Sequence, residues 1–192
     1  MNFTELSPLS SRGAVLSGTT PRAGAVAEPG YTRLAPPRGF RPLHGPVSDV
    51  QFGGRIPFHK GNSQAQKLGL AYERRVHDVL ENIYVDKFRA TPSILYRDKK
   101  SRLRRAIPDG LLEFPDYLLA IEIKLTHTEK AWWQLVKLYQ PLLQNLYPGR
   151  RVLLVEICRS YDPAVQFPLP HKLIHSLRDV PLFQIGVLEW KI

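Results

Sequence analysis

The chain contains the stretch Leu118-Leu119-Ala120-Ile121-Glu122-Ile123-Lys124-Leu125, which belongs to a β-strand expected over residues 117–125. Side chains alternate between the two faces of a strand, so the odd-numbered residues form one apolar face and Glu122 and Lys124 lie on the other. A strand covered by helices is normally apolar on both faces. The charged pair therefore leaves two alternatives open: a structural cross-strand ion pair, or a site that uses a carboxylate beside an ammonium group.

A second strand is expected over residues 107–114, joined to the first by a turn at residues 115–116. Antiparallel pairing of these strands would place Asp109 near Glu122 on the same face. Two converging carboxylates repel each other unless a cation neutralises them, and oxygen ligands completed by water suit Mg²⁺ or Mn²⁺. Lys124 would point at the same cavity, where it can orient a water or stabilise charge on a phosphate. In isolation, Asp109 would instead be read as a turn residue that follows a proline.

The residues Pro108-Asp109 and, further on, Glu122-Ile123-Lys124 resemble the signature of the PD-(D/E)xK nuclease superfamily. Residues 67–76 are similar to the opening helix of Holliday junction resolvase-like members, in which a glutamate joins the metal site. The resemblance covers residues 62–158. It implies that Asp109, Glu122 and the backbone carbonyl of Ile123 bind Mg²⁺, with Mn²⁺ as a substitute. Lys124 would assist the attacking water, and Glu73 would support the metal or the water.

The activity implied by this resemblance is hydrolysis of DNA phosphodiester bonds by an endonuclease or resolvase-like enzyme, with water as the nucleophile. Resolvase-like relatives act as dimers, so a homodimer is one expected state. RecB-like members carry a glutamine and a tyrosine four residues apart on the helix after the lysine. Here Gln134 and Tyr139 are five apart. Gln134 therefore either approaches the scissile phosphate or faces solvent.

The hydrophobic pattern predicts an α/β domain over residues 62–192. A helix is expected from residue 62 or 63 to about 84, because its apolar residues recur at spacings of three and four. A second helix is expected over residues 128–147, bent or broken at Pro141. Further strands are expected at 93–96, 151–158 and 185–192, with a short helix near 171–177. This order corresponds to the restriction-endonuclease-like αβββαβ core, a central mixed sheet flanked by helices.

Residues 1–61 have a different composition from the rest of the chain. Residues 1–60 contain 8 of the 17 prolines and 8 of the 13 glycines and show no hydrophobic period. Such a segment buries too little apolar surface to offset its ordering entropy, so an extended N-terminal arm is expected here. The arm is either a linker or processed leader, or a tether that docks on a partner protein or on nucleic acid.

The net charge of +10 favours a polyanionic partner such as DNA. Residues 97–105 carry six lysines and arginines against one aspartate. Each phosphate that such a cation neutralises releases counterions and adds salt-dependent affinity. The residues expected to contact DNA are Lys99, Lys100, Arg102, Arg104, Arg105 and Gln134. A solvated hairpin tip or a nuclear import signal is the alternative for this segment.

Other classes of protein are excluded by simple features of the sequence. The single cysteine, Cys158, excludes an internal disulfide and a zinc site built from cysteines. The sequence shows no apolar run long enough to span a membrane and no secretory signal. An intracellular protein is therefore expected, either cytoplasmic or virus-associated. The alternative function is a non-cleaving DNA-binding or assembly protein of the same fold, anchored by its arm in a larger complex such as a viral particle.

Overall fold

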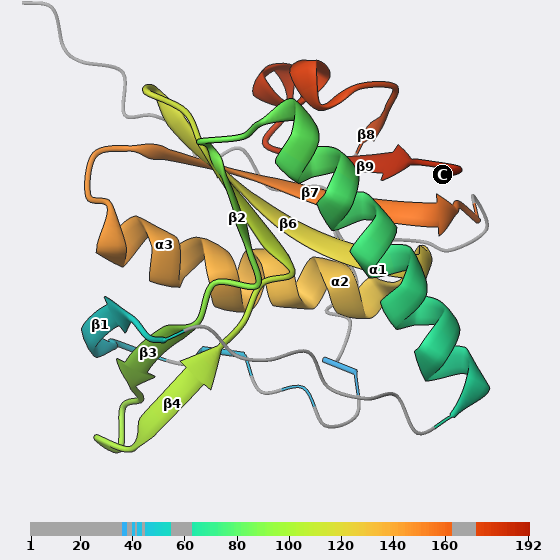
Figure 1. The fold of residues 1–192 in the computed structure, drawn as a ribbon. Helices are drawn as coiled ribbons and strands as arrows, with labels where there is room; N and C mark the ends of the chain where they lie inside the picture. The colour runs from blue at the N-terminus through green and yellow to red at the C-terminus, as the bar shows by residue number, and fades with distance from the viewer. Residues whose placement is uncertain (1–35, 38–39, 41, 44, 55–62, 163–171) are drawn as a thin grey trace, which may run out of the picture. The chain divides into compact units, whose positions relative to one another are not determined.

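The computed structural model describes residues 36–37, 40, 42–43, 45–54, 63–162 and 172–192. In these residues, helices pack on a mixed β-sheet (Figure 1). The helices are α1 (Gln64–Ile83), α2 (Glu129–Gln134), the π-helical turn η1 (Leu135–Tyr139), α3 (Gln140–Leu146) and the 3₁₀ helix η2 (Leu177–Leu182). The strands are β1 (Ser48–Phe52), β2 (Phe88–Ala90), β3 (Ile94–Arg97), β4 (Leu103–Ala106), β5 (Gly110–Glu113), β6 (Tyr117–Thr126), β7 (Arg151–Ser160), β8 (Lys172–Ile174) and β9 (Ile185–Glu189). None of the helices in these residues combines the length and the apolar character that a transmembrane span requires.

The central sheet has six strands in the order β2-β5-β6-β7-β9-β8. Strands β5 and β6 are antiparallel, whereas β6, β7 and β9 run parallel to one another. The sheet is therefore mixed, as the sequence predicts, and the α/β class is confirmed. The long strands β6 and β7 lie at its centre and are buried along most of their length.

Each face of the central sheet has its own hydrophobic core. On one face, Tyr72, Val76 and Leu80 of α1 pack on the odd-numbered residues of β6 and β7. On the other face, α2, η1 and α3 cover the even-numbered residues (Figure 1). Because Glu122 and Lys124 are even-numbered, they lie on the face that α2 and η1 cover.

Helix α1 begins where the sequence predicts because Ser63 caps it. The Ser63 hydroxyl accepts a hydrogen bond from the backbone N–H of Gln66 at 3.2 Å, and the Gln66 side chain accepts one from the Ser63 N–H at 3.0 Å. This reciprocal capping box fixes the first turn of the helix. It thereby decides which residues face the sheet: Tyr72 is buried, and Glu73 beside it is half-buried at the edge.

Strands β1, β3 and β4 form a separate three-stranded sheet, which differs from the sequence prediction in two respects. The sequence places residues 48–52 in the arm, but β1 pairs with β3 and so belongs to the domain. The strand predicted over 107–114 begins only at Gly110, because the preceding residues 103–106 form β4 and pair with β3. The strand predicted at 93–96 is present as β3, in this small sheet. Residues 1–35, 38–39, 41, 44 and 55–61 of the predicted arm lie outside the described residues.

Two further predictions need correction. The helix predicted near 171–177 is wrong, because residues 172–174 form β8 and the 3₁₀ helix η2 follows it. The helical stretch 129–146 does not break at Pro141. The carbonyl of Lys137, four residues earlier, accepts a hydrogen bond from the Leu43 N–H at 3.1 Å in place of the one that proline cannot donate. The irregular turn is η1, immediately before α3. The strands predicted at 151–158 and 185–192 are present as β7 and β9.

Gly110 starts β5 directly after Asp109 and has no room for a side chain. A Cβ atom there would lie 2.7 Å from Cε2 of Phe88, whose ring packs against His77. We expect Gly110→Ala to lower the free energy of unfolding by about 1–3 kcal/mol, as overpacking of a core does. Urea denaturation would measure this loss. The matched control is Gly69→Ala in α1, where a Cβ meets nothing within 4 Å, and we expect it to raise stability by up to about 1 kcal/mol. Equal stability of G110A and the wild type would contradict the prediction.

Candidate functional site

The strand pairing of β5 and β6 brings Asp109, Glu122 and Lys124 together. Gly110 is opposite Ile121 in the register, so Asp109 lies beside the next residues of β6. One oxygen of Asp109, Oδ2, accepts a hydrogen bond from the backbone N–H of Ile123 at 2.7 Å. The Lys124 Nζ atom lies 3.6 Å from that same oxygen and donates a hydrogen bond to Oε1 of Glu122. The juxtaposition predicted from the sequence is therefore present.

Glu122 is a carboxylate in an apolar setting. Its side chain is 1% exposed. Burial, together with the negative charge of Asp109, raises the pKa of Glu122 to about 8, although Lys124 acts in the opposite direction. Its second oxygen, Oε2, is buried and has no hydrogen-bond partner of standard geometry among the described residues, although the Tyr139 hydroxyl is close enough to lower the pKa of Glu122. A buried carboxylate oxygen without a partner is costly, so this atom is a candidate ligand for a cation.

Lys124 is the positive charge of the site. Burial alone would lower the pKa of Lys124, but the charges of Glu122 and Asp109 outweigh burial and raise that pKa. The ammonium group therefore stays protonated across the physiological range. With one ammonium between two carboxylates, the cluster carries an excess of negative charge whenever both carboxylates are ionised.

Glu73 adds a third carboxylate from α1. Burial and the charge of Asp109 raise the pKa of Glu73 to about 7, whereas Lys124 lowers it. Glu73 therefore lies within electrostatic reach of both groups. Its position beside the buried Tyr72 places it where α1 meets the edge of the apolar core.

His77 was not expected at the site. Its Nε2 atom lies 2.8 Å from the backbone carbonyl of Asp109, which can only accept, so Nε2 carries the proton. His77 is 3% exposed, and burial lowers the pKa of its ring. It follows Glu73 by four residues, one helical turn, and this spacing is the signal by which the sequence could have revealed it. His77 holds the backbone that carries the Asp109 carboxylate.

The π-helical turn η1 brings Gln134 and Tyr139 together despite their five-residue spacing. A π-helix bonds residues i and i+5, so this spacing places the two side chains over one another. Gln134 Nε2 donates to the Tyr139 hydroxyl at 3.1 Å, and this hydroxyl donates to the backbone carbonyl of Ile107 at 3.0 Å. Burial and the charges of Glu122 and Asp109 raise the pKa of Tyr139. Gln134 is thus connected to the site through a tyrosine, and its side chain is half-buried.

A second buried carboxylate, Glu156, lies opposite Glu122 on the parallel strand β7. Its two oxygens are occupied: Oε2 lies 2.8 Å from Nδ1 of His127, and Oε1 accepts from the backbone N–H of Thr128 at 3.0 Å. Glu156 therefore connects the start of α2 to the sheet through these hydrogen bonds. Its charge also raises the pKa of Lys124.

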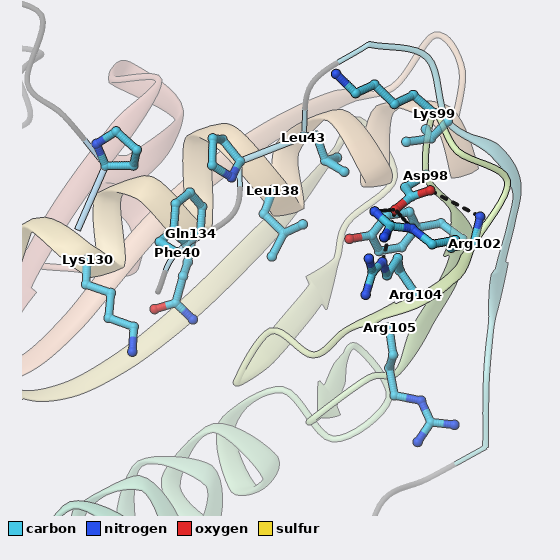
Figure 2. Close-up of a pocket in the computed structure, with 14 residues that line it drawn as sticks. Phe40, Leu43, Asp98, Lys99, Arg102, Arg104, Arg105, Lys130, Gln134 and Leu138 are labelled. Carbon is cyan, nitrogen blue, oxygen red and sulfur yellow. Dashed lines mark hydrogen bonds and ion pairs between the residues drawn. The ribbon is translucent and has the colours of Figure 1, made fainter. Parts of the chain in front are cut away.

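The predicted DNA-binding residues do not all lie together. A pocket of about 610 Å³ is lined by Lys99, Arg102, Arg104, Arg105 and Gln134, whereas Lys100 is not part of its lining (Figure 2). Lys130, which the sequence analysis did not single out, lines it as well. Hydrogen bonds from the basic segment, chiefly from Arg102 and Arg104, outweigh desolvation and hold the pKa of Asp98 well below its usual range.

The described residues contain no group of three or more His, Cys, Asp or Glu side chains arranged to hold a metal ion. The donor set where β5 meets β6 is smaller: the carboxylates of Asp109 and Glu122, which Lys124 contacts, and the carbonyl of Ile123 that the sequence resemblance adds. Mg²⁺ commonly uses one or two carboxylates and completes its coordination with water and substrate phosphates. Two carboxylates and a carbonyl are therefore chemically sufficient for this cation.

Fold and site together define a mixed α/β protein with a buried carboxylate–lysine cluster on its central hairpin. No protein-family model matches the chain, and no characterised protein or solved structure matches it either. A functional assignment therefore depends on the residues of this chain and their arrangement.

Proposed function

We propose that the chain is a metal-dependent deoxyribonuclease of the PD-(D/E)xK type with a restriction-endonuclease-like core. The observation that carries the proposal is the contact of Lys124 with both Asp109 and Glu122 on adjacent strands. A structural ion pair needs one carboxylate for one ammonium. When ionised, the two carboxylates here, with Glu73 within electrostatic reach, carry more negative charge than Lys124 can balance.

The donor set supports Mg²⁺ as the cofactor, with Mn²⁺ able to substitute. Asp109, Glu122 and the carbonyl of Ile123 would hold it, and the buried, unpartnered Oε2 atom of Glu122 fits this role. When bound, such an ion would supply positive charge to phosphate oxygens and acidify a coordinated water. The carboxylates are hard oxygen ligands, which suit Mg²⁺ and Mn²⁺ better than soft metals.

The chain's own residues would activate the water, stabilise charge on the phosphate and hold the site in place. Protonated Lys124 would position the attacking water and stabilise negative charge on the phosphate. Glu73, whose pKa lies near neutrality, is suited to accept a proton from that water. His77 would hold the Asp109 backbone in place, and Gln134 would meet the DNA backbone beside Tyr139.

The arrangement of elements also supports a restriction-endonuclease-like core. The antiparallel hairpin β5–β6 carries the carboxylates, β7 lies parallel to β6, and the helical stretch from α2 to α3 connects β6 to β7 across one face. Helix α1 covers the other face and supplies Glu73. A homodimer and an arm that docks on a partner stay predictions, which sedimentation velocity and truncation of the arm would test.

The experiment that tests the proposal is a cleavage assay on supercoiled, linear, single-stranded and four-way-branched DNA. Each substrate is incubated with the protein in Mg²⁺, Mn²⁺ or EDTA, and Asp109→Asn serves as the variant that weakens the donor set. We expect cutting in Mg²⁺ and Mn²⁺, none in EDTA, and a large loss for D109N. Absence of cutting on every substrate, with salt-sensitive DNA binding intact, would overturn the proposal and favour the non-cleaving assembly role.

A further inference from the structure

The pocket that the basic segment lines has an apolar floor beneath its cationic rim. We call it the strand pocket and define it by Phe40, Leu43 and Leu138 on the floor and Lys99, Arg105 and Lys130 on the rim. Figure 2 shows Arg102, Arg104 and Arg105 on one side of the strand pocket and Lys130 and Gln134 on the other. Its two walls therefore come from the β3–β4 hairpin and from the helix that carries Gln134.

The cations on the rim are available to a ligand. Arg102 and Arg104 are held by Asp98, at 3.0 and 3.1 Å. Lys99, Arg105 and Lys130 are exposed, and none of them makes an ion pair within the part of the chain that the structure describes. Unpaired cations around a concave surface attract polyanions and raise their local concentration.

The apolar floor discriminates between kinds of polyanion. In a DNA duplex the faces of the bases are stacked inside the helix, and only phosphates, sugars and base edges meet a protein. A single strand presents base faces as well, and proteins bind it by combining a basic groove with aromatic side chains on which the bases stack. Phe40 and Tyr96 are aromatic residues of this lining. A volume of about 610 Å³ is in the range of small-molecule pockets, roughly 300–1,000 Å³, and suits a nucleotide.

The strand pocket leads to the candidate catalytic residues through Gln134. This side chain lines the strand pocket and also donates a hydrogen bond to Tyr139. The Tyr139 hydroxyl in turn donates a hydrogen bond to the backbone carbonyl of Ile107, two residues before Asp109, so these contacts connect the strand pocket with the carboxylates. A strand whose bases enter the strand pocket would thus have its backbone directed toward Glu122 and Lys124.

We propose that the strand pocket binds the bases of single-stranded DNA, so that the enzyme acts on DNA with an unpaired end or branch. This inference rests on the proposed nuclease function for the choice of substrate, but its binding step is independent of cleavage. It predicts that bases contribute to affinity, whereas a purely electrostatic surface would respond only to the number of phosphates.

The test is a binding titration in EDTA, in which nothing can be cut. Fluorescence anisotropy of the full chain is measured with a labelled single-stranded DNA, the same strand with abasic positions, and a blunt duplex. We expect the abasic strand to bind at least about fivefold more weakly than the normal strand, since stacking contributes that much per base. The duplex should also bind more weakly than the normal strand. Equal affinity for the normal and abasic strands, or preference for the duplex, would overturn the proposal.

Matched variants assign the effect to the strand pocket. Leu138→Glu places a negative charge on its floor, whereas Val85→Glu makes the same change at a 73% exposed position outside it. We expect L138E to weaken single-strand binding about tenfold or more and V85E to weaken it by less than about twofold. Equal losses in the two variants would overturn the proposal.

A second pair of variants avoids any change in the floor. Lys130→Ala should reduce the slope of log affinity against log salt by about 0.7, the value for one phosphate contact on a single strand, whereas Lys67→Ala on α1 should not. An unchanged slope in K130A would count against the proposal. If the protein binds single-stranded DNA through its bases but does not cut, the strand pocket is supported and the nuclease proposal is refuted. If the protein cuts DNA but the bases add nothing to affinity, the nuclease proposal is supported and the strand pocket is refuted.

Discussion

Replacing Lys124 with methionine is expected to reduce DNA cleavage by about 10³-fold while the protein keeps its fold. Methionine retains the unbranched stem that packs beside β6 but lacks the ammonium group that contacts Glu122 and Asp109. Removing one preorganised group that stabilises charge in a transition state typically costs about 10²–10³ in rate. Lys124 would in addition position the water, which is the reason for the upper value.

The raised pKa of Glu122 is the reason why this variant should fold. Glu122 loses its cation, but its pKa is already raised to about 8, so it can take up a proton at neutral pH instead of staying charged. Thermal unfolding followed by circular dichroism would check the fold. Lys67→Met, at an exposed position of α1, is the matched control and should cut DNA at the wild-type rate. Full activity of K124M would remove Lys124 from the mechanism.

The sequence was sufficient to predict the hairpin that forms the site. Strand β6 is long and apolar, and its alternation places Glu122 and Lys124 on one face. A one-residue slip in its pairing with the neighbouring strands would exchange the two faces of the strand, so the register is strongly specified. The short turn to β5 then fixes the register that sets Asp109 beside Glu122. Ser63 likewise marks the start of α1 and with it the orientation of Glu73. Each of these features is local, and each was confirmed.

The features that the sequence did not predict depend on contacts between distant segments. Strand β1 has only five residues, with Val50 and Phe52 as its alternating apolar positions, and is stabilised by pairing with β3, so in the sequence it reads as part of an irregular arm. Strand β4 lies within the basic segment 97–105 and its neighbour Ala106, and its leucine, Leu103, is exposed. Its sequence therefore shows no alternation of apolar and polar residues that would predict a strand. Tertiary pairing determines both strands, and propensity does not reveal it.

The π-helical turn is the clearest example of this limit. Counted on an ideal α-helix, Gln134 and Tyr139 point in different directions, so the five-residue spacing looks like a departure from the glutamine–tyrosine pattern. The π-helical turn η1 accommodates the five-residue spacing and brings Gln134 Nε2 to 3.1 Å from the Tyr139 hydroxyl. Such single-turn insertions are frequent at functional sites. The buried hydroxyl of Tyr139 and its bond to Ile107 select this geometry.

In the metal-free protein, the free energy of unfolding is expected to fall as the pH rises from about 4.5 to 8. The pKa of Glu122 is raised to about 8 and that of Glu73 to about 7, from 4.5. The folded protein therefore binds these protons more tightly than the unfolded chain, and stability is lost where the folded state still holds them and the unfolded state does not. The pKa of His77 is lowered in the folded protein, so the unfolded chain binds a proton at this histidine more tightly. The contribution of His77 to the free energy of unfolding therefore rises as the pH approaches 6.5 from below.

Glu122→Gln separates the contribution of Glu122 from these others, since glutamine does not titrate while His77 remains. Urea denaturation in EDTA at pH 5, 6.5 and 8 should show the wild type losing on the order of 3 kcal/mol more than E122Q across this range, because each unit of pKa shift corresponds to about 1.4 kcal/mol and part of the shift lies outside the range. Mg²⁺ should raise the stability of the wild type more at pH 8 than at pH 5, because it binds only ionised carboxylates. E122Q should lose most of this stabilisation. Parallel pH profiles for the two proteins would contradict the raised pKa of Glu122, and equal stabilisation of both by Mg²⁺ would place the ion elsewhere.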